Sequence, residues 1–161
     1  MAAREDQQNA TKGSPTNLPA PLRAAALAAE LLGDVCVPEA GDPLRLEVVG
    51  MLARDLAREL KTLATVAGRP EVVEGALRAA DIANLAACTA PELLKARAVE
   101  AAAAAHLAAG AASALCTLAR AGGEDAPADE HAQNTLKDVR GALWRARLAA
   151  RQVDEFLEER V

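Results

Sequence analysis

The stretch ARAVEAAAAAHLAAGAASALCTLARAGG, which begins at Ala96, limits the folds open to this chain more than any other feature. Ala has the highest helix propensity of all residues, so a run of this length without Pro predicts one long helix. Tyr is absent from the 161 residues, and there is only one Phe and one Trp. Because aromatic side chains favour strands, their scarcity leaves little strand signal. We therefore expect an all-α protein whose helices pack closely around a thin core.

Gly, Pro and Asp residues divide the chain into about five predicted helices. The expected helices span residues 19–32, 43–67, 70–88, 90–121 and 129–161. The motif TAPE at Thr89 matches a capping box, so we expect a helix to begin there. Residues 1–17 are polar and mixed in charge, which predicts a disordered N-terminal tail. Residues 18–161 then form a single helical-bundle domain.

The last two predicted helices carry small or apolar residues at alternating spacings of three and four. This pattern runs from Leu94 to Ala119 in one helix and from Leu136 to Leu157 in the other. Such spacing is typical of helices that pack along a coiled-coil seam. Because a short Gly-rich segment joins them, we expect a long antiparallel C-terminal hairpin within an antiparallel helical bundle.

A second stripe lies one residue beyond the seam on each helix of this hairpin. In an antiparallel pair both stripes turn to the same side, so they are predicted to line one groove. The helix ends set a register with His106 level with Trp144, Gly110 with Arg140, and Ser113 with Lys137. The predicted groove residues are His106, Gly110, Ser113, Lys137, Arg140, Trp144, Arg147 and Arg151.

The groove has two interpretations that the sequence leaves open. In one it is a solvated face, with Arg side chains lying over Trp144 through cation–π contacts. In the other it is a recognition surface, because Trp and Arg are enriched at binding hot spots and cations favour an acidic protein partner or a small anion. We therefore expect a non-enzymatic protein-interaction or assembly module. The alternative is a bundle that binds a small anionic ligand, or an enzyme with a polar pocket near His106.

Several classes of function are disfavoured by the sequence. Metal ligands on a helix need partners three or four residues away, but His106 has Ala103 and Gly110 there, so no metal, cofactor or catalytic residue is predicted. The net charge of −5 argues against nucleic-acid binding. A membrane span is disfavoured because Glu100 and His106 interrupt the apolar stretch. Three Cys residues without a CxxC motif predict buried thiols in a cytoplasmic protein.

The unequal lengths of the helices predict self-association. The hairpin helices are each about thirty residues long, or roughly 45 Å, whereas the first and third helices are much shorter. Both ends of the hairpin should then overhang, and an exposed apolar patch usually marks an interface. We therefore expect a homodimer, the alternative being a monomer whose first helix and loop cover the overhang. The residues expected in the overhang are Leu115, Leu118, Leu136 and Val139 at one end and Leu93, Leu94, Phe156 and Leu157 at the other.

Overall fold

The computed structural model describes residues 19–66, 68–122 and 129–160, so the predicted N-terminal tail lies outside the described residues. The all-α prediction is confirmed, since these ranges contain helices and no strand. The elements are α1 Pro19–Val35, α2 Leu44–Val66, α3 Arg69–Thr89, the short 3₁₀ helix η1 Ala90–Glu92, α4 Lys95–Ala121 and α5 Glu130–Glu158.

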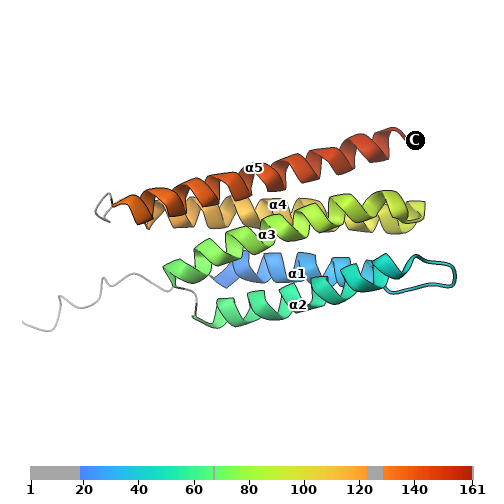
Figure 1. The fold of residues 1–161 in the computed structure, drawn as a ribbon, viewed down its shortest axis with the longest axis horizontal. Helices are drawn as coiled ribbons and strands as arrows, with labels where there is room; N and C mark the ends of the chain where they lie inside the picture. The colour runs from blue at the N-terminus through green and yellow to red at the C-terminus, as the bar shows by residue number, and fades with distance from the viewer. Residues whose placement is uncertain (1–18, 67, 123–128, 161) are drawn as a thin grey trace, which may run out of the picture.

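Helix α3 occupies the centre of the molecule. Figure 1 shows it crossing over α4, with α5 on one side and α1 and α2 on the other. It packs against all four of these helices. In addition, α1 contacts both α2 and α4, and α4 contacts α5. Each long helix therefore finds its apolar neighbours within the same chain.

The core is built mainly from Ala, as the composition predicts. The fully buried side chains larger than Val are few: Leu22, Leu32, Leu46, Leu60, Ile82 and Leu115. At the centre, Gly75 of α3 lies against α1 and α4, and a Cβ built on it would be 2.2 Å from Leu22 Cδ2 and 3.4 Å from Leu115 Cδ1. The side chain of Leu22 therefore fills the space that a larger residue at position 75 would need.

The buried face of α2 includes small residues beside an exposed larger one. The Leu52 side chain is 47% exposed, whereas Ala53 and Ala57 are buried. Nearby, Gly50 lies so close to the end of α1 that an added Cβ would be 3.2 Å from Cys36 Cβ. Close packing against α1 thus selects the small residues of α2 and leaves a larger one outside.

The capping box expected at Thr89 does not form. The Thr89 hydroxyl donates to the carbonyl oxygen of Leu85 at 2.6 Å, so it belongs to the last turn of α3. Helix α4 begins only at Lys95, after η1, and no side chain caps it. The prediction is wrong because a Thr hydroxyl can bond back to its own helix as readily as forward to the next.

The predicted overhang of the hairpin is also wrong. Leu115, Val139 and Leu93 are buried, and of the expected residues only Leu94 is exposed, at 72%. Helix α3 packs along both α4 and α5. At the other end, Val35 and Leu46 form a cluster with Leu93, against which Phe156 and Leu157 pack. The chain covers its own ends, so the overhang gives no support to a dimer.

Helix α4 is long and apolar enough to cross a membrane by length and composition alone. Half of its most apolar window is buried inside the fold, as expected of a central helix in an Ala-rich core. Its buried positions contact α1, α3 and α5.

The side chain of Arg97 joins the start of α4 to the end of α1. Its guanidinium donates to the carbonyl oxygens of Val35, at 2.7 and 3.0 Å, and Val37, at 2.9 Å. It also pairs with the carboxylate of Asp42 at 2.9 Å, and that carboxylate accepts the backbone N–H of Glu39 at 2.8 Å. Since the last carbonyls of a helix have no partner within it, Arg97 caps α1 and holds the loop that follows.

This clamp makes stability depend on pH. The backbone N–H of Glu39 and the Arg97 guanidinium hold the pKa of Asp42 below its ordinary value. The folded state thus gains stability that is fully present above the unfolded pKa of about 3.9 and is lost as the pH falls through the lower folded pKa. We expect Asp42→Asn to lower the melting temperature at neutral pH, with a difference from the wild type that begins to shrink below about pH 5 and is lost as the pH falls through the folded pKa. Thermal unfolding followed by circular dichroism measures the melting temperatures of both proteins over this pH range. A difference between them that does not change with pH would contradict the prediction.

Candidate functional site

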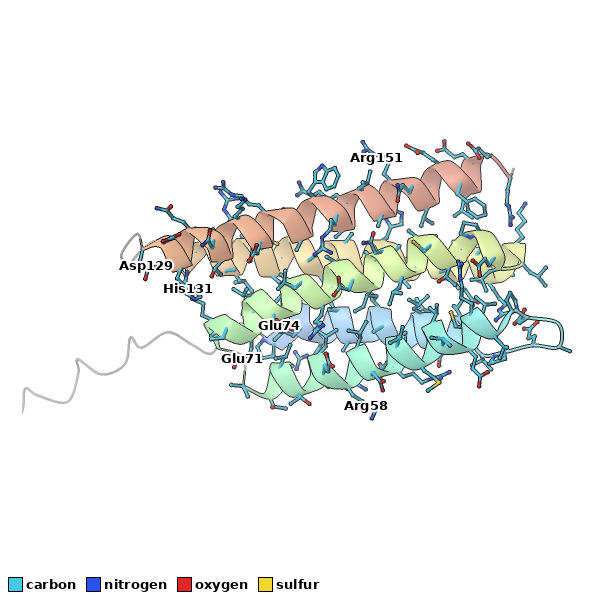
Figure 2. All side chains as sticks on the ribbon, in the orientation of Figure 1. Arg58, Glu71, Glu74, Asp129, His131 and Arg151 are labelled. Atoms are coloured by element: carbon cyan, nitrogen blue, oxygen red, sulfur yellow. The ribbon has the colours of Figure 1, made fainter. Side chains whose placement is uncertain are left out.

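The solvent side of α5 carries a row of cations around one indole. Lys137, Arg140, Trp144, Arg147 and Arg151 are all exposed, and we call these five residues the cationic face. The Trp144 side chain is 65% exposed. In Figure 2, Arg151 points away from the other helices. The spacing of three and four residues, which predicted a common stripe, places these side chains on one side of α5.

The charges of this face are little neutralised within the part of the chain that the structure describes. Lys137, Arg140 and Arg147 form no ion pair there, and Arg151 lies 4.0 Å from Glu155. The expected stacking of an Arg on Trp144 is also not found among these residues, where the guanidinium over an aromatic ring is that of Arg160 on Phe156. An anionic group that approaches the face would therefore meet uncompensated positive charge.

The structure brings His106 to a partner that the sequence did not indicate. Its Nε2 lies 2.7 Å from Asp154 Oδ1, whereas the predicted register placed His106 level with Trp144, ten residues earlier in α5. Ser113, predicted level with Lys137, instead accepts a long hydrogen bond of 3.5 Å from Arg147. The predicted register is wrong because helix ends alone set it. It ignored the packing of α5 on α3 and the lean of side chains toward the start of their own helix.

The two glycines beside these residues lie in open space. A Cβ built on Gly110 or on Gly141 would have no neighbour within 4 Å. Gly110 and His106 line a shallow hollow of about 570 Å³, but this hollow lies between α4 and α1, with Ala20, Pro21 and Ala24 on its other side. Gly141 is three residues from Trp144, on the exposed side of α5. The residues of the predicted groove are thus divided between the hollow beside α1 and the exposed side of α5.

A second hollow, of about 400 Å³, lies where the first turns of α3 and α5 meet. Figure 2 shows His131 on α5 above Glu74 and Glu71 of α3. Asp129 also lines the hollow, but its carboxylate caps α5 by accepting the backbone N–H of Ala132 at 2.7 Å. Sequence reasoning missed this hollow, because it depends on how two helix starts about 60 residues apart in the chain pack together.

Few groups suited to catalysis or metal binding gather in the described residues. No three His, Cys, Asp or Glu residues there lie close enough together to hold a metal ion. Burial raises the pKa of the Cys36 and Cys116 thiols, which makes them poor nucleophiles at neutral pH. Cys88 is exposed, contrary to expectation, and all three cysteines are free.

Comparison of the chain with models of protein families, with curated proteins and with solved structures finds no match. Its function must therefore be inferred from its own surface.

Proposed function

We propose that the chain is a non-enzymatic antiparallel helical bundle, with α4 and α5 as its C-terminal hairpin, that acts as a protein-interaction module in the cytoplasm. The cationic face of α5 binds an acidic partner protein. In this role the rest of the bundle holds α5 rigid, so that its exposed side chains are already positioned for the partner.

The observation that carries this proposal is the exposure of Trp144 among four cations, of which only Arg151 has an ion-pair partner in the described ranges. An exposed indole loses contact with water when a partner covers it, and Trp and Arg are the residues most often found at binding hot spots. The surrounding positive charge would speed the encounter with an acidic surface and orient it. The overall charge of the chain is negative, so this face also differs from the average surface.

The hollow beside His106 offers less for a small anionic ligand or for catalysis. Apart from His106, its lining consists of Ala, Pro, Leu and Gly residues, which provide no further charge and no side-chain nucleophile. His106 itself is bonded to the Asp154 carboxylate, and a carboxylate in that position repels anions. The cationic face has no such competing group on Arg140 or Lys137 within the described residues.

Charge reversal on the face tests the proposed function. We expect Arg140→Glu with Arg147→Glu to reduce capture of acidic proteins from a native lysate by at least about tenfold. The reason is that each ion pair between the cationic face and a carboxylate of the bound partner becomes a repulsion. Since both side chains are exposed, helicity and melting temperature should stay close to those of the wild type. Quantitative mass spectrometry of the captured proteins is the measurement.

The matched control is Arg23→Glu with Lys95→Glu, which makes the same change in net charge at two exposed positions outside α5. Capture by this control should equal capture by the wild type. Equal capture by all three proteins would remove the cationic face from the proposal.

A further inference from the structure

Charge is separated along the exposed side of α5. The cationic face occupies positions 137–151, and the last turns of the same helix carry exposed carboxylates at Asp154, Glu155, Glu158 and Glu159. The exposed side of α5 is thus rich in cations between positions 137 and 151 and acidic in its last turns, so it complements a copy of itself that runs in the opposite direction. From this we infer that the acidic partner is a second copy of this chain, whose α5 pairs antiparallel with the first across a two-fold axis. The inference rests on the proposed function of the cationic face and identifies its partner.

The exposed positions of α5 fit a two-fold axis placed between Arg147 and Leu148. In that pairing Lys137 faces Glu158 of the second copy, and Arg140 faces Glu155 of the second copy. Because the two-fold axis repeats each contact, these two contacts give four ion pairs between the two copies of α5. All four of these side chains are exposed in the single chain, and opposite charges at such positions are the usual determinants of pairing and orientation between helices.

The same axis also gives Trp144 and the neighbouring Gly141 a partner. Trp144 faces Arg151 of the second copy, which allows the guanidinium to lie on the indole. Gly141 faces Asp154 of the second copy, and the open space at this glycine lets the helices approach closely. Arg147 lies beside the axis, where two copies of it would repel, but its guanidinium reaches toward Ser113 on α4, away from α5.

Displaced pairings are less favourable. A shift of one heptad in one direction sets Lys137 opposite Arg151 of the second copy, and a shift in the other sets Arg151 opposite itself. A parallel pair would place every cation against a cation. The N-terminal residues 1–18 do not complement the face either, since Arg4 and Lys12 balance Glu5 and Asp6. Among these pairings, the unequal charge along the helix favours the first register and the antiparallel direction.

A charge-swap experiment on the full chain tests this pairing by sedimentation equilibrium at low salt. Because one helix pair is a small interface, we expect the wild type to dimerise with a dissociation constant in roughly the micromolar range. Arg140→Glu and Glu155→Arg should each raise that constant at least about tenfold, since each creates two repulsions. An equimolar mixture of the two variants should dimerise about as well as the wild type, because the mixed dimer restores both contacts between positions 140 and 155, one with the native charges and one with the charges exchanged. Circular dichroism of each variant confirms that it folds.

Two results would overturn the inference. One is a wild type that stays monomeric up to about 200 µM, a concentration far above the dissociation constant expected of such an interface. The other is a mixture that is no more dimeric than either variant alone. The proposed function fails separately. If the wild type is monomeric but Arg140→Glu with Arg147→Glu still loses its captured acidic proteins, the face binds a different partner. If self-association is absent and capture is also unchanged, both proposals are wrong.

Discussion

Replacing Gly75 by Ala is expected to destabilise the fold by about 1–3 kcal/mol. In an open helix the same change stabilises by up to about 1 kcal/mol, because Ala has the higher helix propensity. At Gly75 the added methyl group would lie 2.2 Å from Leu22 Cδ2. Leu22 is fully buried, so its side chain can move only by displacing other core atoms, and the packing penalty outweighs the helical gain.

A double-mutant cycle shows whether this contact is the cause. Leu22→Ala alone should lose about 2–5 kcal/mol of unfolding free energy. Combined with Gly75→Ala it should lose clearly less than the two changes added together, because the new methyl group occupies space that Leu22 has left. Gly110→Ala, where an added Cβ meets nothing, is the control and should stabilise by about 1 kcal/mol. Urea unfolding gives all four values, and simple additivity would exclude this explanation.

Arg97→Ala is expected to lower the unfolding free energy by about 2–3 kcal/mol, because it removes several hydrogen bonds from a charged donor to carbonyls at the end of α1. Its side chain is only 14% exposed, so water replaces these bonds incompletely. The loop between α1 and α2 should also lose its protection from hydrogen exchange before the helices do. Urea unfolding and exchange measured by mass spectrometry check the two effects.

The effect of Arg97 depends on the shape of its guanidinium as well as on its charge. Arg97→Lys should recover little of the lost stability, since an ammonium group is less suited to bonding two carbonyls and a carboxylate at once. Lys95→Ala, in the same turn but exposed, should change stability by less than about 0.5 kcal/mol. An Arg97→Lys variant as stable as the wild type would show that charge alone holds the loop.

The helices could be predicted because their signals are local, and the errors occur where a residue serves a distant contact. The first helix was expected to end at residue 32, before Gly33, but α1 continues to Val35 with Gly33 buried inside it. A Cβ at Gly33 would lie 3.0 Å from Arg54 Cγ. A Gly that ends a helix and a Gly that admits a neighbouring side chain look the same in sequence, so only the packing of α2 distinguishes them.

The candidate site was predictable to the same extent. The spacing within α5 placed Trp144 and the four cations on one stripe, and all five side chains are exposed. The pairing of His106 with Asp154 could not be predicted, because it depends on how far α5 slides along α4. The Arg97 clamp joins residues 55 to 62 positions apart, and nothing in the local sequence of either segment indicates it.

The exposure of Trp144 has a practical consequence for work on this protein in solution. The chain has no Tyr and no second Trp, so its near-ultraviolet absorbance and its intrinsic fluorescence arise almost entirely from one indole on the outer side of α5. That indole already contacts water in the folded state, and unfolding should therefore shift its emission very little. Anything that covers α5 should shift the emission to shorter wavelength. The emission of Trp144 should therefore report binding at α5 while responding very little to unfolding.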